Sequence, residues 1–315
     1  MDFYQIEQIL AVAKTGSISE AARLMCVSQP TMSYAVSKAE QEFGAKFFDR
    51  SSYPLKLTFA GEQYVQTAQE MKRLRRDLEK VCLDVSRQAA GKLHIGIPHN
   101  RSAQILPRIL REYESLYPHI QLDYYSTSAE ELMERLARGE LDLCILTKVD
   151  QDPRFRYEGL YTEELLAAAA EGVVQPRHLL AENHQVLRLE ALSELPLLLP
   201  NARSGLGKML QKLFEYYDIV PPSVRRLDAN NALYSLAAAG LGVAILPQNV
   251  IRQSAHAPHL KTYSLSGRGV GWTVCAIFRR DATISEAENT LLTLIRREFA
   301  SPHEQLDLFP HFSGK

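Results

Sequence analysis

The sequence predicts an α/β protein with three parts: a winged helix-turn-helix at the N-terminus, a long linker helix and a two-lobed α/β domain. Residues 16–61 read as two short helices joined by a tight turn and followed by a β-hairpin. Residues 67–85 repeat apolar side chains at alternating steps of four and three, and from residue 92 onward strand and helix patterns alternate. The predicted parts are 1–58, 59–90 and 91–300, with a flexible tail over 301–315.

The composition is typical of a water-soluble protein of the cell interior. The chain has 315 residues, of which 46% are hydrophobic and 23% charged, and its formal net charge is −1. This length suffices for two or three domains. The sequence contains no apolar run of about eighteen residues that could span a membrane, and its first residues lack the apolar core of a signal peptide. We therefore expect a cytoplasmic protein with no membrane partner.

The pattern in residues 16–44 indicates a helix-turn-helix. Ala21 and Ala22 are small enough to let a second helix cross at close range, and the chain turns after them. Ser28 then occupies an N-cap position, where its hydroxyl accepts from a free backbone N–H. Pro30 falls in the first turn of the next helix, where a missing N–H costs little. The second helix should bury one face at helical spacing, formed by Met32, Ala35, Val36, Ala39 and Phe43.

The opposite face of this second helix carries short polar side chains. They suit the major groove of DNA, because base edges and phosphates take hydrogen bonds there. The hairpin adds two basic residues that could contact phosphates, while Glu40 and Glu42 are expected at the far end of the helix. The candidate DNA-binding residues are Ser28, Gln29, Pro30, Thr31, Ser33, Tyr34, Ser37, Lys38, Arg50 and Lys56.

Charge gives this interpretation weaker support. Basic and acidic side chains balance over residues 1–60, so non-specific affinity for DNA should be modest and tight binding should need two copies on one site. For any single Lys or Arg of this segment, a solvated surface charge is the alternative interpretation.

The N-terminal segment closely resembles the DNA-binding domain of the LysR-type transcriptional regulators. The matching residues occur in order and are Gly16-Ser17, Ala21-Ala22, Leu24, Val27-Ser28-Gln29-Pro30, Ser33, Glu40, Gly44, Phe47-Phe48, Arg50, Pro54-Leu55, Leu57-Thr58 and Ala60-Gly61. Two positions depart from the family pattern. Tyr34 stands where a basic residue is usual, which removes a phosphate contact, and Ala39 stands where an apolar residue is usual, which should loosen the packing slightly.

The predicted linker helix carries an apolar stripe, here called the seam, with charged side chains between its members. The seam is narrower than the buried face of a globular helix, so we expect the helix to pair with a second copy. The LysR resemblance implies the same dimer contact, and packing on its own domain is the alternative. Gly91 is expected to end the helix at the C′ position. The seam consists of Thr67, Met71, Leu74, Leu78, Val81 and Val85, of which the last five are the candidate dimerisation residues.

From residue 92 the alternation of strands and helices indicates parallel βαβ units. The expected strands are 93–97, 120–125, 141–146, 163–170, 195–199, 223–227, 243–247 and 271–278. The expected helices are 102–116 with Ser102 as N-cap, 129–138, 206–217, 231–239 and 284–299. The last strand and helix complete the first set, so the chain should cross between two lobes near 161 and near 265. This double crossover is the plan of the type 2 periplasmic-binding-protein fold, with lobe I over 91–161 and 266–300 and lobe II over 162–265.

This second region also resembles the effector domain of the LysR-type regulators along nearly its whole length. The matching features are Gly96, Leu106-Pro107, Tyr117-Pro118, Gly139-Glu140-Leu141-Asp142, Gly240-Leu241-Gly242-Val243-Ala244 and Leu246-Pro247. The resemblance implies a small-molecule effector in the cleft between the lobes and assembly as a homodimer or homotetramer. General α/β architecture indicates the same place, because ligands bind beyond the carboxyl ends of strands, at helix N-termini.

Polar side chains follow the predicted strands of both lobes. Hydroxyls, amides and two arginines at helix starts suit a small anion, most simply a carboxylate. For Ser102, Ser128 and Ser204, capping without a ligand is the alternative, and Arg101 and Arg203 could instead form surface ion pairs. The candidate effector-binding residues are His99, Asn100, Arg101, Ser102, Ser126, Thr127, Ser128, Thr147, Asn201, Arg203, Ser204 and Asn231.

No motif indicates catalysis. The stretch around Gly205 and Lys208 lacks the first glycine and the final Ser or Thr of a phosphate-binding loop. Glu130-Glu131 and Glu163-Glu164 are adjacent pairs, so their carboxylates should diverge instead of acting together.

The cysteines are widely scattered and make no metal-ligand spacing with the histidines, so neither a metal nor another cofactor is expected. Cys144 and Cys275 fall in apolar strand patterns, where core packing is the main interpretation and a redox switch the alternative.

Together these features predict a transcription factor and not an enzyme. It should bind double-stranded DNA at an interrupted palindrome as a homo-oligomer and respond to a small-molecule effector. The alternative is a small-molecule sensor whose main output is a protein contact, for instance with RNA polymerase.

Overall fold

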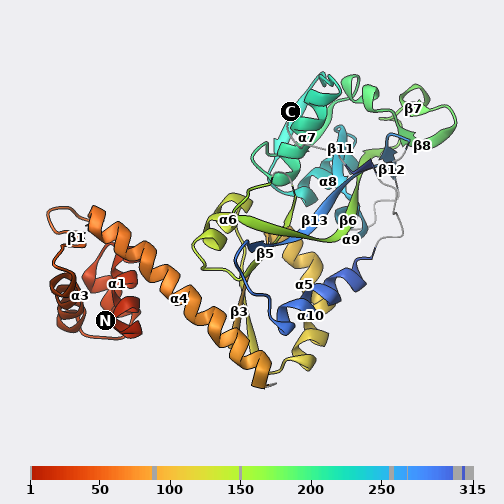
Figure 1. Ribbon diagram of the computed structural model, residues 1–315. Coiled ribbons are helices and arrows are strands. Elements are labelled where there is room, and N and C mark those ends of the chain that lie inside the picture. Colours follow the sequence, from red (N-terminus) through yellow and green to blue (C-terminus); the bar gives the residue numbers. More distant parts are fainter. Residues whose placement is uncertain are drawn as a thin grey trace. The chain divides into compact units, whose positions relative to one another are not determined.

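The computed structural model describes residues 2–86, 91–148, 151–254, 259–267, 269–300 and 307–308 (Figure 1). The chain forms two compact units, one made mainly of Met1–Arg87 and the other of most residues from Gln88 onward. The first unit is helical with a small hairpin, and the second is built on a large mixed sheet. The predicted α/β fold class is confirmed.

The N-terminal unit contains the predicted helix-turn-helix and hairpin. Its first three helices begin with side-chain caps, because Asp2, Ser17 and Ser28 each accept from a backbone N–H three residues ahead. The turn between the second and third helices includes Cys26 at a φ of 54°. The elements are α1 (Phe3–Thr15), α2 (Ile18–Leu24), α3 (Gln29–Phe43), β1 (Phe48–Asp49), β2 (Lys56–Leu57) and α4 (Phe59–Ser86).

The hairpin is held against both neighbouring helical segments. The N–H of Leu55 donates to the carbonyl of Gly16 at 2.8 Å. A Cβ on Gly61 would lie 2.0 Å from the carbonyl oxygen of Phe47, so α4 can approach the hairpin this closely only with glycine at that position. Phe47 and Phe48 join Tyr64 and the helices in one apolar core.

The described part of the long helix α4 reaches Ser86, and residues 87–90 lie outside the described part of the chain. Gly91 has a φ of 139°, and its N–H donates to the carbonyl of His119 at 3.1 Å as the first residue of a strand. The prediction that Gly91 ends the linker helix is therefore wrong. Its conformational freedom serves the entry into the sheet instead.

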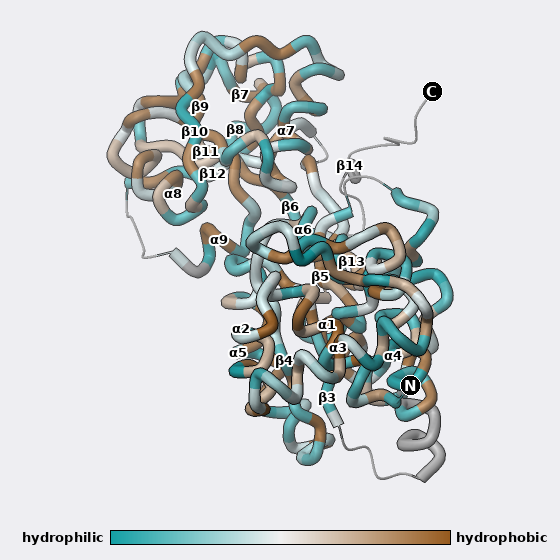
Figure 2. Tube along the Cα trace, turned by 90° about the vertical axis from the view of Figure 1, so that its left-hand side faces the viewer, coloured by the Kyte–Doolittle hydropathy of each residue, from teal (hydrophilic) through white to brown (hydrophobic). Residues whose placement is uncertain are grey.

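Lobe I of the second unit has helices on both faces of its strands. Leu143 and Ile145 face the core under α5 and α10, whereas Cys144 and Leu146 face the core under α6, as the two-residue period of a strand requires. In Figure 2, brown (apolar) stretches of the chain lie around the labels of β5 and β13 (Val270–Arg279). The elements are β3 (Gly91–Gly96), α5 (His99–Leu116), β4 (Ile120–Tyr125), α6 (Ala129–Ala137), β5 (Leu143–Thr147) and α10 (Glu286–Glu298).

Lobe II repeats this layered plan. Leu197 and Leu199 face α7, and Leu198 between them faces α8 and α9. The strands β7, β8 and β12 and the helix α9 were not predicted: β7 and α9 are very short, and β8 (NHQVL) and β12 (LKTYSL) mix polar and apolar side chains without a clear period. The elements are η1 (Pro176–His178), β7 (Leu179–Leu180), β8 (Asn183–Leu187), η2 (Leu189–Ser193), β9 (Leu197–Pro200), α7 (Gly205–Tyr216), β10 (Val224–Leu227), α8 (Asn230–Ala238), β11 (Val243–Pro247), α9 (Gln248–Gln253) and β12 (Leu260–Leu265).

Two long antiparallel strands, β6 (Phe155–Ala170) and β13 (Val270–Arg279), run through both lobes. They join the described strands of this second unit into one continuous sheet, with the order β10-β9-β11-β6-β13-β5-β3-β4 along its main path, while β1 and β2 form a separate hairpin sheet. Along β6, Tyr161 belongs to the lobe I core and Leu165 to the lobe II core. Along β13 the change falls between Trp272 and Val274, later than the 265 expected from the sequence, because β13 begins inside the lobe II core.

The C-terminal segment contributes one further strand. β14 (Asp307–Leu308) pairs in parallel with Val270 and Gly271 of β13. The remainder of the predicted flexible tail, 301–306 and 309–315, lies outside the described residues.

Candidate functional site

The outer face of α3 is polar and open to solvent. The candidate residues at 29, 33 and 37 form one row and those at 30, 34 and 38 the next, because residues four apart stack along a helix. Ser33 and Ser37 are half-buried and the other four are exposed, with Tyr34 at 68%. At the helix start, Ser28 Oγ accepts from the N–H of Thr31 at 3.2 Å and lies 2.7 Å from Thr31 Oγ1. These two hydroxyls therefore also serve as the cap.

Glu40, near the end of α3, links this helix to the hairpin. Its side chain is 2% exposed, and Oε1 accepts from the N–H groups of Phe47 at 2.9 Å and Phe48 at 3.4 Å. Its Oε2 takes Lys46 Nζ at 2.9 Å and Arg50 Nη2 at 3.3 Å. As the sequence predicted, Glu40 lies near the far end of α3. The hairpin folds back over this end and brings Lys46 and Arg50 to the carboxylate, which the sequence did not predict, so Glu40 becomes the centre of a buried joint.

This joint sets the protonation state of Glu40. Burial alone would raise the pKa of its carboxyl, but the bonds from Lys46, Phe47 and Phe48 outweigh burial and hold the pKa below its ordinary value. Arg50, a candidate phosphate contact, is half-exposed while paired with Glu40. To contact a phosphate, the guanidinium of Arg50 must therefore either bind Glu40 and the phosphate together or break its ion pair with Glu40. Lys56 at the start of β2 is exposed.

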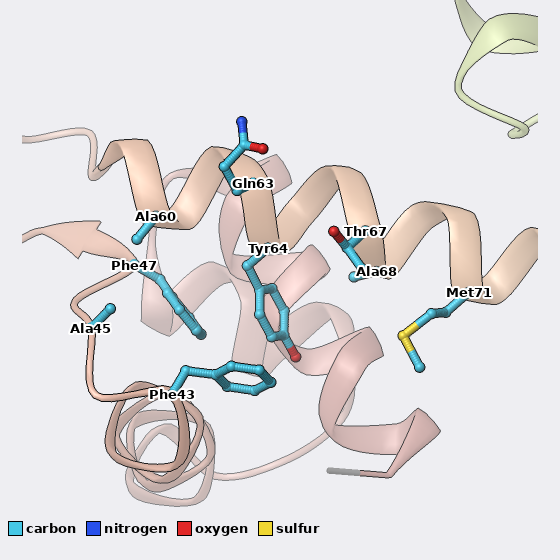
Figure 3. Close-up of a pocket in the computed structure, with 9 residues that line it drawn as sticks. All are labelled: Phe43, Ala45, Phe47, Ala60, Gln63, Tyr64, Thr67, Ala68 and Met71. Carbon is cyan, nitrogen blue, oxygen red and sulfur yellow. The ribbon is translucent and has the colours of Figure 1, made fainter.

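The start of α4 forms an apolar pocket with the end of α3, with a volume of about 380 Å³ (Figure 3). Two seam residues, Thr67 and Met71, lie on its wall, and Met71 also packs on the core of its own unit. In the first part of the helix the seam therefore packs on its own unit, which was the alternative interpretation. The pocket is lined by Phe43, Ala45, Phe47, Ala60, Gln63, Tyr64, Thr67, Ala68 and Met71.

Further along α4 the seam is not covered by its own unit. Leu74 is 54% and Leu78 63% exposed. The side chains of Val81 and Val85 lie outside the described part of the chain. Two large leucines on one helix face are therefore open to a partner.

In lobe I, the helix that follows the first strand begins earlier than predicted. α5 starts at His99 with Pro98 in the cap position, and Ser102 Oγ donates to the carbonyl of His99 at 2.7 Å inside the first turn. The prediction of Ser102 as N-cap is wrong, because Pro98, at a φ of −59°, already supplies the extended entry to the helix. His99 and Asn100 are exposed.

Arg101, from the first turn of α5, is buried instead of lining an open anion site. Its Nη1 donates to Tyr161 Oη and its Nη2 to Thr147 Oγ1, both at 2.9 Å. Its Nη1 also lies 3.6 Å from Glu163 Oε2, and its guanidinium lies 5.7 Å from the centre of the Trp272 ring. Burial lowers the pKa of Arg101, but Tyr161 and Glu163 outweigh it and hold the pKa above its ordinary value. Arg101 therefore already has a carboxylate partner within the chain.

In lobe II, the predicted residues gather at the start of α7. Ser204 Oγ accepts from the N–H of Gly207 at 3.0 Å and donates to the carbonyl of Asn201 at 2.7 Å, so the capping interpretation holds for Ser204. Asn201 Oδ1 accepts from the N–H of Arg203, whose own side chain is exposed. Asn231, in the first turn of α8, is exposed too.

Ser126, Thr127 and Ser128 precede α6 in lobe I. Ser126 is exposed, Thr127 Oγ1 donates to Glu131 Oε2 at 2.6 Å, and Ser128 Oγ accepts from the N–H of Glu131 at 3.3 Å. All three hydroxyls therefore lie at the N-terminal end of this helix.

The structure adds functional candidates that sequence reasoning missed. Lys208 Nζ of α7 donates to Glu130 Oε1 of α6, which joins the two lobes at their helix starts. This bond is the main cause that lowers the pKa of Glu130. Glu163 and Trp272 contact Arg101 from strands that are distant in sequence, and no local pattern identifies such partners. The predicted divergence of Glu163 and Glu164 is observed, since Glu164 Oε1 accepts from Ser264 Oγ at 2.7 Å.

Two of the thiols, those of Cys144 and Cys275, are buried in the core, whereas Cys26 is exposed. Burial raises the pKa of the Cys144 thiol, and it raises that of Cys275 to about 11, which keeps both thiols protonated and poorly reactive. Among the described residues, no cluster of His, Cys, Asp or Glu is arranged to hold a metal ion. No helix in the described ranges is long and apolar enough to span a membrane.

Comparison with known proteins identifies the family. Residues 3–62 match the family model for the bacterial regulatory helix-turn-helix of the LysR family, and residues 86–300 match the LysR substrate-binding domain. This chain belongs to the LysR family of transcriptional regulators. The family consists of DNA-binding regulators with an effector-binding domain and not of enzymes.

Similar LysR-type proteins extend over almost the whole chain. The transcriptional regulator TfdS of Cupriavidus pinatubonensis is 26% identical over 284 residues, which cover 90% of this chain and 94% of TfdS. MetR of Salmonella typhimurium is 26% identical over 304 residues, with 96% and 92% covered. A full-length OxyR variant from Pseudomonas aeruginosa has a similar fold, with a TM-score of 0.70 at 21% identity and with 95% and 97% covered.

Proposed function

We propose that this LysR-type regulator binds an interrupted palindromic operator as a homo-oligomer in the cytoplasm and responds to a small effector between its lobes. The proposal rests on one observation: the same unit has both an exposed polar face on α3 and two exposed leucines on α4. The first can enter a major groove, and the second can hold two copies at a fixed spacing.

In this proposal each copy reads one half-site. Residues from Ser28 to Lys38 on the outer face of α3 contact base edges, and Lys56 with Arg50 contacts flanking phosphates. The seam residues Leu74 and Leu78, with Met71, Val81 and Val85, form the contact between copies. Two recognition helices joined in this way should meet successive major grooves, which requires two half-sites about one helical turn apart. A solved structure of CbnR, 21% identical with a TM-score of 0.61, is a complex with its target DNA.

The proposed effector site lies between the helix starts of the two lobes. Ser126, Thr127 and Ser128 lie at the N-terminus of α6 and Asn201, Arg203 and Ser204 at that of α7, and the bond from Lys208 to Glu130 links these two helix starts. Helix N-termini with hydroxyls and amides favour a small anion such as a carboxylate. An effector that binds one arrangement of the lobes more tightly would shift the equilibrium between the DNA-bound states. The size of this shift is limited to the difference in the effector's binding free energy for the two arrangements.

The test of the DNA-binding assignment uses the full chain and its operator in a binding titration. Ser33→Arg and Pro30→Ala should abolish specific binding while the circular dichroism and melting temperature stay close to those of the parent protein. Gln41→Ala, an exposed change at the other end of the same helix, is the matched control and should bind normally. Operator binding retained by both variants would exclude α3 as the recognition helix.

The effector assignment is tested by thermal shift of the full chain against small carboxylates. A ligand at a hundredfold excess over its Kd adds about 2.7 kcal/mol of stability, enough to raise the melting temperature measurably. If the protein is folded and binds its operator but none of the small carboxylates raises its melting temperature, a carboxylate effector is contradicted.

A further inference from the structure

The buried carboxylate of Glu163 has unused hydrogen-bonding capacity. Its side chain is 2% exposed, and Oε2 accepts from Trp272 Nε1 at 2.9 Å. The other oxygen, Oε1, is buried and has no hydrogen-bond partner among the described residues. A carboxylate can accept about four hydrogen bonds, and leaving a buried polar atom without one costs about 1–3 kcal/mol.

The nearest cation does not satisfy this group. Arg101 Nη1 lies 3.6 Å from Glu163 Oε2, beyond hydrogen-bonding distance, and donates instead to Tyr161 Oη. Its Nη2 is directed to Thr147 Oγ1. The positive charge of Arg101 is thus balanced by Glu163, while the free acceptor of Glu163 is on the other oxygen. Next to Arg101 the unused hydrogen-bonding group is therefore the buried acceptor Glu163 Oε1, and Arg101 itself is not a free cation.

Glu163 also lies where the chain passes from one lobe to the other. It is paired in register with Trp272 between the two long strands, and it stands between Tyr161 of the lobe I core and Leu165 of the lobe II core. Both strands pass from the core of one lobe to that of the other at this level, so we expect a rearrangement of the lobes to bend them here. A ligand held here would act directly on that bend.

We propose that the effector of this regulator carries a hydrogen-bond donor, a hydroxyl or a protonated amine, that binds Glu163 Oε1. The inference rests on the proposed effector response and refines its chemistry. In this proposal the anionic end of the molecule binds at a helix start and its donor end binds Glu163, which lies beside Arg101 in the first turn of α5, so the ligand class is a hydroxy or amino carboxylate. An unsubstituted carboxylate leaves the buried oxygen without a partner.

The test compares matched carboxylates by thermal shift of the full chain. The probes are propionate, lactate and alanine, and succinate, malate and aspartate, which differ within each set only by hydrogen, hydroxyl or ammonium. Members with a donor should bind wild-type protein at least tenfold more tightly than the unsubstituted member.

The decisive variant is Glu163→Gln. Its amide can still accept from Trp272 but presents an N–H where Oε1 stood, so binding of the donor-bearing probes should fall at least tenfold and unsubstituted carboxylates should gain. Glu164→Gln is the matched control, because it removes the same charge from the next residue of the same strand, whose carboxylate bonds Ser264. It should respond to the probes as the parent does.

Two results would overturn the inference. If unsubstituted carboxylates stabilise the parent as strongly as their hydroxy and amino relatives, the carboxylate effector stands and the donor requirement is wrong. The second result is a change in melting temperature on Glu163→Gln that is the same in the absence and in the presence of each probe. In that case a buried water, and not a ligand, satisfies Oε1. Operator binding by α3 is measured separately and is not affected by either result.

Discussion

Two buried glutamates, one in each unit, differ in how completely the protein satisfies them. Glu40 accepts from two backbone N–H groups and two cations, whereas Glu163 accepts one indole N–H and has a buried oxygen without a partner among the described residues. A fully bonded carboxylate fixes one arrangement of its surroundings, while an under-bonded one is ready to accept a further donor. The first is suited to a rigid DNA-binding unit and the second to a unit that must respond.

The largest effect should come from removing the satisfied carboxylate. Glu40→Ala leaves the N–H groups of Phe47 and Phe48 without an acceptor, and we expect a loss of about 3 kcal/mol in the unfolding free energy of the N-terminal unit. Calorimetry of the full chain, which separates the melting of two units, measures it. Glu20→Gln removes an exposed carboxylate that pairs with Arg23 and should cost less than about 0.5 kcal/mol. A Glu40→Ala protein as stable as this control would show that the joint does not stabilise the unit.

The same carboxylate should make the N-terminal unit sensitive to acid. Because the folded pKa of Glu40 lies below its ordinary value of 4.5, its contribution is complete above that value and is lost as the pH falls through the folded pKa. Melting of the N-terminal unit followed from pH 7 downward should therefore show a steeper loss of stability in the parent than in Glu40→Gln. Parallel curves for the two proteins would contradict the assigned direction.

Removing the single donor to Glu163 should have the next largest effect. Trp272→Phe keeps an aromatic ring but leaves the buried carboxylate without a hydrogen bond from the chain, and we expect a loss of about 2 kcal/mol in the second unit. Trp272 is the only tryptophan, so calorimetry must replace fluorescence. Tyr117→Phe, which removes a neutral bond of 3.0 Å to Thr290, should cost about 1 kcal/mol. An equal cost for the two would mean that Glu163 does not depend on Trp272.

The sequence could predict the parts of the molecule that depend on local signals. Ser28 as a cap, Pro30 in a first turn and the alternating strands of lobe I each follow from residues close together in the chain. The long strand β6 was recognised only in its second half, because the residues from Phe155 to Tyr161 mix charged, polar and apolar side chains without a clear period.

The partners of buried charges could not be predicted in the same way. The sequence predicted Arg101 as a ligand-binding residue or a member of a surface ion pair, yet it is buried, and its partners Tyr161 and Glu163 come from about sixty residues further on and Trp272 from a later strand still. The partners of Glu40 were likewise not predicted, because Lys46 and Arg50 reach it only through the fold of the hairpin over α3. The hydrogen-bond partners of a buried polar group come from tertiary contacts, and no local sequence pattern identifies them.

The smallest stability effect should distinguish the two roles of Arg50. Its side chain is 49% exposed, so screening by water makes its ion pair with Glu40 worth less than about 1 kcal/mol, and Arg50→Ala should hardly change melting. If Arg50 contacts a phosphate, the same change should weaken operator binding and lower the slope of log affinity against log salt by about 1. Lys46→Ala removes the other cation from Glu40 outside the candidate DNA-binding set and should leave that slope unchanged. If the slope of log affinity against log salt is the same for Arg50→Ala, Lys46→Ala and the parent, Arg50 does not contact a phosphate. Its role would then be only to pair with Glu40 in the joint between α3 and the hairpin.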